Sequence, residues 1–207
     1  MARDRASRPE AKPLRLFVAV DVPDDVQAGL EESLTPYRDR IPGARWTQRS
    51  GWHVTLKFLG TTWPRLVEPV KVAVAEAAGA SAPFETALAE IGAFPSARRA
   101  RVVWAGLTDE DGRFAELAKR LDDLLQEDFT PERRALTPHL TVARLTPPRA
   151  MDEFAPDLPG KAVASRTFRI DELVLYQSHL SPKGATYEPL ERRPLGAGGQ
   201  DSTAESI

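Results

Sequence analysis

Apolar and polar positions along the chain predict strands and helices in an irregular order. Strand-like runs, with alternating or continuous apolar residues, lie at 14–20, 52–59, 84–91, 101–107, 136–145, 168–177 and 186–190. Pro23, Asp24 and Asp25 indicate the start of a helix that runs to about Arg38, and helical spacing marks 65–78 and 110–127. We expect the segment 92–100, which holds Pro95, to be a loop. Because the strands outnumber the helices and do not alternate strictly with them, the pattern predicts an α+β fold with antiparallel or mixed sheets.

Composition narrows the class of protein without naming an activity. The 207 residues carry a formal net charge of −2, 42% are hydrophobic, and none is Cys, which excludes disulfides, thiolate metal sites and a cysteine nucleophile. No apolar run approaches the roughly 20 residues that cross a bilayer, so we expect a cytoplasmic protein that does not contact membranes. We expect residues 1–12 to be a flexible extension, 13–194 to form a single domain, and 195–207 to be a disordered tail.

Two of the three histidines lie in the same local pattern. His53-Val54-Thr55-Leu56 and His139-Leu140-Thr141-Val142 both read His, apolar, Thr, apolar, and they lie 86 residues apart, one in each half of the chain. On a strand, successive side chains point to opposite faces, so each His shares a face with its Thr while the apolar neighbours point into the core. If a pseudo-twofold relates the halves, both polar pairs face one cleft.

Such a set of groups suits chemistry at a phosphorus centre. One neutral imidazole takes a proton from the attacking oxygen, and a second, protonated imidazole gives a proton to the leaving oxygen. The hydroxyls of Thr55 and Thr141 can bond the non-bridging oxygens. No metal ligand set is suggested, since His-x-Thr lacks the spacing of a zinc motif, and we expect no cofactor. The alternative is that both histidines simply pack within their strands.

Five segments, taken together and in this order, resemble the 2H phosphoesterase superfamily. More closely, they resemble its bacterial and archaeal RNA 2′,3′-cyclic phosphodiesterases, also described as 2′-5′ RNA ligases. These segments are Arg15–Val20, Trp52–Gly60, Arg101–Leu107, Thr137–Arg144, and Leu175–Ser178 with Gly184–Pro189.

The resemblance implies two pseudo-symmetric lobes, each an antiparallel sheet with outer helices, and an active-site cleft between them. It implies metal-independent hydrolysis of a terminal 2′,3′-cyclic phosphate to a 2′-phosphomonoester. His53 would then be the general acid, His139 the general base, and Thr55 and Thr141 the phosphate-binding residues. Arg144 resembles a family position that contacts the phosphate, although strict strand alternation places it on the face opposite His139.

Other candidates come from position and residue type. Phe17 could stack on a base or pack in the core. Tyr176 and Ser178 share strand parity and could line the cleft, and Lys57 shares parity with His53. Further residues carry weaker indications. The basic cluster Arg98, Arg99 and Arg101 could contact an RNA backbone or be solvated. The four tryptophans could stack on a base or pack in the core, and His179 is expected in a loop; the tryptophans are Trp46, Trp52, Trp63 and Trp104.

We therefore expect an enzyme, a monomer, that acts on RNA ends or on small cyclic or 2′-5′ phosphodiester nucleotides. Three alternatives remain open: an RNA- or nucleotide-binding module without turnover, a reversible 2′-5′ RNA ligase, and a phosphodiesterase of small cyclic nucleotides. Both motifs are intact, and a binding module has no need for two titratable groups around one phosphate, so the pattern favours the enzyme.

Overall fold

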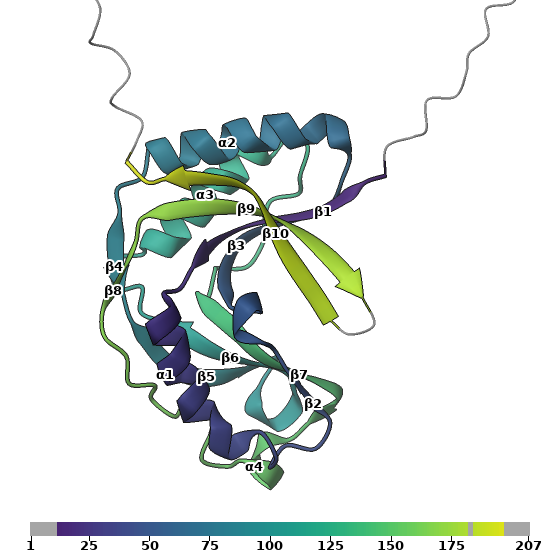
Figure 1. Cartoon of the computed structure of the whole chain (residues 1–207), viewed down its shortest axis with the longest axis vertical. Coiled ribbons are helices and arrows are strands. Elements are labelled where there is room, and N and C mark those ends of the chain that lie inside the picture. The colour runs from purple at the N-terminus through teal and green to yellow at the C-terminus, as the bar shows by residue number, and fades with distance from the viewer. Residues whose placement is uncertain (1–11, 182–183, 197–207) are drawn as a thin grey trace, which may run out of the picture.

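A computed structural model describes residues 12–181 and 184–196. Within these residues, eight strands form one antiparallel sheet in the order β10-β9-β1-β3-β7-β6-β5, with β2 added on β7, and two short strands, β4 and β8, form a second sheet (Figure 1). The strands are β1 (Leu14–Asp21), β2 (Ala44–Trp46), β3 (His53–Thr62), β4 (Phe84–Thr86), β5 (Leu88–Phe94), β6 (Ala100–Leu107), β7 (His139–Arg149), β8 (Phe168–Ile170), β9 (Glu172–Ser181) and β10 (Gly184–Pro194). The predicted α+β class is confirmed.

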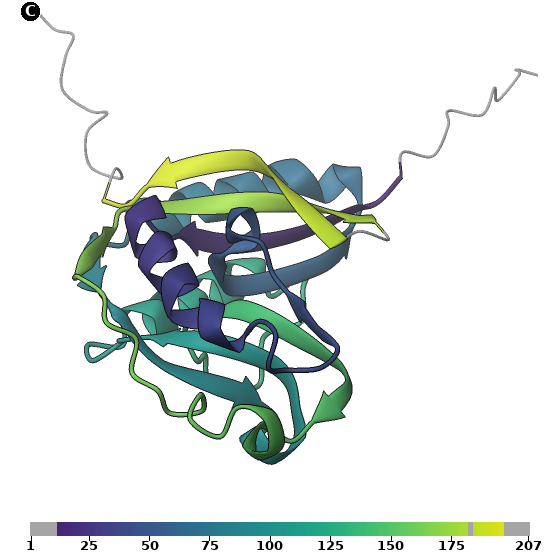
Figure 2. The same ribbon diagram turned by 60° about the horizontal axis from the view of Figure 1, so that its bottom comes forward.

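The large sheet consists of two halves that meet at one point. Strands β10, β9, β1 and β3 form one half, and β7, β6, β5 and β2 form the other (Figures 1 and 2). Between the halves, β3 and β7 share a single register pair, Val54 opposite Leu140. The predicted antiparallel halves are therefore confirmed, and they are joined into one continuous sheet with the two motif strands as the seam.

Four α-helices in the described residues lie outside the sheet: α1 (Asp24–Leu34), α2 (Val67–Gly79), α3 (Arg113–Leu125) and α4 (Met151–Phe154). α2 packs on β9, β10 and α3, while α3 packs on β3. The helix predicted at 110–127 is α3, whose Phe114, Leu117, Leu121 and Leu125 are buried at helical spacing. The Asp109 carboxylate accepts hydrogen bonds from the Phe114 and Ala115 backbone N–H groups and so caps its first turn.

Alternation along β1 produces two apolar clusters on opposite faces of the sheet. Leu16, Val18 and Val20 join the main core between sheet and helices. On the other face, Phe17 and Ala19 pack with Val174 and Tyr176 in a small separate cluster. This second cluster lies on the same face as the histidines, so the sheet is packed on both sides here.

Several expected boundaries were wrong. The segment 92–100 is not all loop, because β5 continues to Phe94 and pairs with β6 there. His179 lies on β9 rather than in a loop, and its Nε2 lies 2.8 Å from the Glu188 carboxylate. The core extends past 194, since Leu195 is buried and donates a backbone hydrogen bond to Asp171. The predicted terminal extensions otherwise lie outside the described residues.

None of the helices in the described part of the chain combines the length and the apolar character that crossing a membrane requires.

Candidate active site

The two His-x-Thr motifs lie side by side at the seam of the sheet. Because Val54 stands opposite Leu140 in an antiparallel pair, His53 is level with Thr141, and Thr55 is level with His139. Val54 and Leu140 are fully buried on the core face, so the histidines and threonines share the other face, called here the histidine face. If the same register continues by one residue along each strand, each histidine stands opposite the threonine of the other motif.

A β-bulge interrupts alternation at the same place in both motif strands. In β3, Lys57 pairs with Val18 and Thr55 with Ala19, so Leu56 is the extra residue. In β7, Ala143 pairs with Val103 and Thr141 with Trp104, so Val142 is the extra residue. After each extra residue, the next side chain points to the core, and the one after it returns to the histidine face. The side chains that return are the exposed Phe58 and Arg144.

The bulge resolves the position of Arg144 and corrects that of Lys57. Arg144 lies on the face of His139, five residues on, although strict alternation predicts the opposite face. Lys57 does not share a face with His53: its side chain is buried, ion-paired with Asp122 of α3, and bonded to the Thr130 carbonyl at 2.8 Å. Lys57 thus fastens α3 to β3 instead of adding charge beside His53.

His53 is held by aromatic rings of three other strands. Its ring stacks on Phe17 of β1 at 4.7 Å between centroids, with Tyr176 of β9 behind at 5.8 Å, and meets Tyr187 of β10 edge-on at 4.8 Å. Phe17 is only 2% exposed, so of the two expected roles, base stacking and core packing, the structure shows packing, and its ring supports the imidazole.

A network of charged and polar groups lies behind this aromatic stack. The Tyr176 hydroxyl donates to Asp21 at 2.7 Å, and Arg192 of β10 is ion-paired with the same carboxylate at 3.1 Å. Asp21 stands opposite His53 in the β1–β3 register. The hydroxyl of Tyr176 is therefore used by Asp21, although its ring adjoins the site as predicted.

His139 is held by a different set of neighbours. Its Nδ1 lies 2.7 Å from the Thr137 carbonyl oxygen, to which the Nδ1–H group donates a hydrogen bond. In the neutral ring, Nε2 is then the nitrogen that can accept a proton. Phe94 meets the ring edge-on at 5.1 Å, and Trp104 lies 6.1 Å away. Gly92 makes this possible, because a Cβ there would lie 2.0 Å from the Trp104 ring.

The surroundings lower the pKa of both imidazoles and differ in charge. Burial lowers the pKa of His53 to about 4, with the Asp21 carboxylate acting to raise it and His139 acting to lower it. Burial also lowers the pKa of His139, the Thr137 carbonyl acts to raise it, and the Arg144 guanidinium lowers it further. One histidine thus lies near a carboxylate and the other near a guanidinium, so the two are not equivalent.

The hydroxyls of Thr55 and Thr141 are available to a ligand. Both side chains are half-buried, and neither hydroxyl has a hydrogen-bond partner within the described residues. A half-buried donor without a partner gains most from a ligand oxygen placed against it. Among the same residues, no three His, Asp or Glu side chains gather as a metal site requires.

The remaining candidates divide between the site and other regions. Ser178 is half-buried and pairs in register with Tyr187, two positions beyond Tyr176 on the same face. Trp104 adjoins His139, Trp52 is buried in the core, and Trp63 is 45% exposed. Trp46 is half-buried beneath the Arg38 guanidinium. Arg98, Arg99 and Arg101 are exposed, and they lie on and beside β6.

Sequence reasoning missed three neighbours of the histidines: Asp21, Phe94 and Tyr187. Asp21 could have been found, since it ends the first strand on the parity of Phe17. Phe94 was assigned to a loop. The position of Tyr187 depends on the register of the β9–β10 hairpin, which no local pattern in the sequence indicates.

Comparisons with known proteins point to one family. The family model of the 2′-5′ RNA ligase superfamily matches residues 18–182. The RNA 2′,3′-cyclic phosphodiesterase of Methanothermobacter thermautotrophicus is 31% identical over 185 residues, which cover 86% of this chain and 97% of that protein. The protein of the same name from Geobacillus stearothermophilus is 30% identical over 193 residues, or 92% of this chain but only 60% of its own length.

Solved structures show the same fold. TT0787 of Thermus thermophilus superposes with a TM-score of 0.77 at 29% identity, covering 88% of this chain and 98% of its own. The apo form of E. coli LigT superposes with a TM-score of 0.72 at 21% identity, covering 89% of this chain and 99% of its own.

Proposed function

The chain belongs to the 2′-5′ RNA ligase superfamily, and from this premise we propose that it hydrolyses RNA 2′,3′-cyclic phosphate ends to 2′-phosphomonoesters. The relatives at about 30% identity that carry the name RNA 2′,3′-cyclic phosphodiesterase support this reaction. The observation that supports the proposal is the register of Val54 against Leu140, which brings the two motif strands together with both histidines and both threonines on the same face.

We assign the base to His139 and the acid to His53. The Thr137 carbonyl holds the Nδ1 proton of His139, and Arg144 disfavours its protonation, so Nε2 is ready to accept a proton from water. His53 faces Asp21, whose negative charge favours the protonated ring that an acid requires. The bound phosphodiester carries a further negative charge, which raises the pKa of both imidazoles in the complex.

The reaction then proceeds at one phosphorus atom. Water loses a proton to His139 as its oxygen bonds to phosphorus. The bond between phosphorus and the 3′ oxygen breaks, and that oxygen takes the proton of His53. Thr55, Thr141 and Arg144 bind the non-bridging oxygens, where charge accumulates in the transition state. The product is a 2′-phosphate with a free 3′ hydroxyl, and solvent returns the proton from His139 to His53. No step in this scheme requires a metal.

The two histidines are tested by single substitutions on a short RNA that ends in a 2′,3′-cyclic phosphate. His53→Ala and His139→Ala should each lower kcat by about 10²–10⁴-fold, because each removes one proton transfer. His179→Ala is the matched control: this third histidine is exposed on β9, paired with Glu188, and should leave kcat unchanged. Circular dichroism and thermal unfolding establish that all three variants fold. Loss of activity only together with loss of the fold would mean that the histidines serve packing alone.

The two hydroxyls are tested by Thr55→Val and Thr141→Val, which keep the branched shape and remove the donor. Each should lower kcat/KM by about 10²-fold, since a donor aimed at the developing charge is removed. Unchanged kinetics in both variants would contradict their assignment to the phosphate. Binding of the RNA without turnover by the unmodified protein would instead favour a binding module. Joining of the cyclic end to a 5′ hydroxyl, which uses the same phosphorus centre, would identify the 2′-5′ ligase activity.

A further inference from the structure

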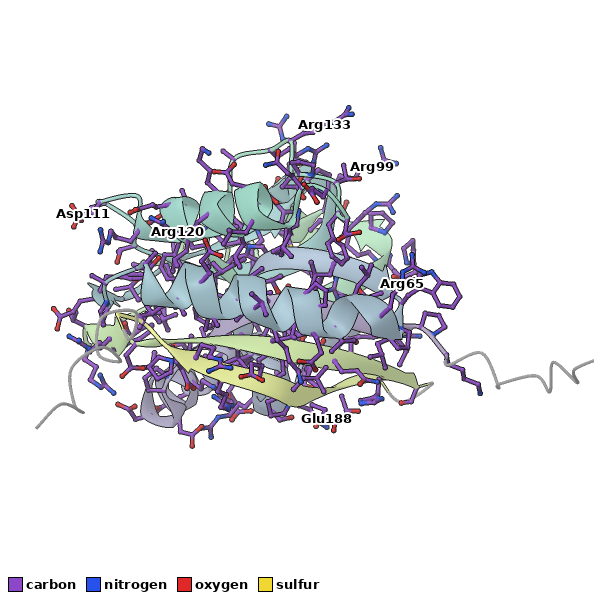
Figure 3. The ribbon with its side chains drawn as sticks, turned by 90° about the horizontal axis from the view of Figure 1, so that it is seen from above. Arg65, Arg99, Asp111, Arg120, Arg133 and Glu188 are labelled. Atoms are coloured by element: carbon purple, nitrogen blue, oxygen red, sulfur yellow. The ribbon has the colours of Figure 1, made fainter. Side chains whose placement is uncertain are left out.

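Charged residues are segregated along this chain in a way that its net charge of −2 conceals. The stretches 41–67, 91–108 and 133–151 contain eleven of the 28 Lys and Arg residues and none of the 30 Asp and Glu residues. These stretches form all of β2, β3, β6 and β7 and the end of β5. Strands β2, β3, β6 and β7 are therefore free of carboxylates, although Asp21 of the neighbouring strand β1 stands opposite His53. Figure 3 shows Arg99 and Arg133 on one side of the molecule and Glu188 on the opposite side.

Many arginines in these stretches also lack an acidic partner. The side chains of Arg45, Arg98, Arg99, Arg101, Arg144 and Arg149 make no hydrogen bond or ion pair within the described residues. By contrast, Arg40, Arg166 and Arg192, which lie outside the stretches, pair with Asp157, Asp25 and Asp21. A guanidinium without a carboxylate partner is free to bind an external anion bidentately.

Arg45 and Arg144 are the most informative pair in this set. They stand directly opposite each other in the antiparallel register of β2 and β7, so their side chains leave the sheet on the same face, the histidine face. Both are exposed. Like charges at opposed positions destabilise a sheet unless an anion lies between or above them. The fold thus sets a second cation one strand beyond the arginine that adjoins His139.

We propose that Arg45 forms a second phosphate subsite, which binds the phosphodiester linking the terminal nucleotide to the rest of an RNA strand. The inference rests on the proposed function, because it takes Arg144 and the two motifs as the site of the reacting cyclic phosphate. Arg144 lies on the strand of His139, while Arg45 lies on the neighbouring strand β2. Arg45 therefore binds the next phosphate along the strand and selects polynucleotide ends over mononucleotides.

The order of the strands that carry these cations favours a single strand of nucleic acid as the occupant. The cations follow strands β2, β7 and β6 in succession, and a chain with regularly spaced phosphates can meet them in turn. Backbone contacts of this kind position a strand without reading its sequence. The structure therefore assigns Arg45 to length recognition and not to base recognition.

Binding is measured first, because it does not depend on turnover. The probe is a fluorescently labelled single-stranded hexaribonucleotide with a 2′-phosphate end, titrated by anisotropy at several salt concentrations. Arg45→Ala should raise Kd by roughly five- to tenfold. It should also lower the slope of log Kd against log salt concentration by about 0.7, the value for one phosphate contact on a single strand. Arg45→Lys, which keeps the charge, should recover most of the affinity. Arg169→Ala is the matched control, since Arg169 is an exposed arginine on β8, in the other sheet, with no ion pair among the described residues.

Kinetics then locate the phosphate that Arg45 binds. Two substrates are compared: a nucleoside 2′,3′-cyclic phosphate, and a dinucleotide ending in the same group, which adds one phosphodiester. Arg45→Ala should lower the preference for the dinucleotide by about five- to tenfold. With the unmodified protein, a dinucleotide whose linkage is a neutral methylphosphonate should lose the same preference over the mononucleotide. Arg45→Ala should lower the preference for this neutral dinucleotide no further.

The results separate the two proposals. If Arg45→Ala binds the hexaribonucleotide as Arg169→Ala does, with the same salt slope, the subsite is refuted whatever the protein catalyses. Equal losses of affinity in Arg45→Ala and Arg169→Ala would also refute the subsite, because the loss would then reflect the general charge of the protein and not a contact of Arg45. If the unmodified protein turns over neither substrate, the proposed reaction fails, and the anisotropy of the Arg45 variants still decides the subsite.

Discussion

Gly92 leaves space for the tryptophan that supports His139. It stands directly opposite Trp104 in the β5–β6 register. A Cβ at position 92 would lie 2.0, 2.2 and 2.5 Å from three atoms of the indole. These atoms belong to a rigid double ring, so Gly92→Ala forces either the indole to rotate or the two strands to separate. Both movements alter the surface against which His139 rests.

The size of the effect follows from this overlap. Overpacking of a rigid ring by one methyl group costs about 1–3 kcal/mol of unfolding free energy. For a domain of this size, that lowers Tm by roughly 2–12 °C. The centroid of the Trp104 ring lies 6.1 Å from that of His139 and 5.2 Å from that of Phe94. Phe94 in turn packs edge-on against the imidazole. Since displacement of a catalytic group by about 1 Å can cost about 10²-fold in rate, kcat/KM should fall by roughly 10–100-fold.

The assay combines thermal unfolding with kcat/KM on an RNA ending in a 2′,3′-cyclic phosphate. Gly29→Ala is the control: a Cβ there meets nothing within 4 Å, and Gly29 lies within α1, so the change should leave activity intact and stabilise the helix slightly. Adding Trp104→Phe to Gly92→Ala should restore part of the lost stability, because the smaller ring vacates the overlap. A Gly92→Ala variant with unchanged Tm and kcat/KM would refute the packing argument.

Three other predictions concern charge. Lys57→Met should lower the unfolding free energy, measured by urea unfolding, by about 3 kcal/mol, because Asp122 loses its buried partner. Adding Asp122→Leu should restore part of that loss. An unchanged urea midpoint in Lys57→Met would show that the ion pair is dispensable. Burial lowers the pKa of His53 to about 4, so below about pH 6.5 the folded state binds fewer protons than the unfolded state. The unfolding free energy, measured by urea unfolding, should therefore decrease as the pH is lowered from 6.5 to 4. This decrease should be less steep in His53→Gln. The pH profile of kcat/KM should be bell-shaped and displaced to the acid side of the kcat profile, because the phosphate raises both imidazole pKa values in the complex; a flat rate between about pH 5 and 8 would exclude two imidazoles.

The elements that local patterns define best were predicted well. α3 follows from its apolar spacing, and the two motif strands follow from their alternation of His, apolar and Thr. Alternation alone also placed the histidines and threonines on a common face. This success has a physical reason, since burial of Val54 and Leu140 leaves the polar residues only one face to occupy.

The misplaced residues depend on long-range pairing. A bulge leaves little local sequence signal, so Lys57 was placed beside His53, while the position of Arg144 required a bend whose place could not be specified. Phe17 is buried because β9 and β10 bring Tyr176 and Tyr187 over it. These contacts join residues from opposite ends of the chain, and no pattern within one segment could show them.

The most direct test of the account is to identify the product formed in excess EDTA from an RNA ending in a 2′,3′-cyclic phosphate. The account predicts a 2′-phosphate as the sole product, at an undiminished rate, with turnover lost in His139→Ala and in His53→Ala. A 3′-phosphate product, a reaction abolished by EDTA, or full activity in either histidine variant would contradict it.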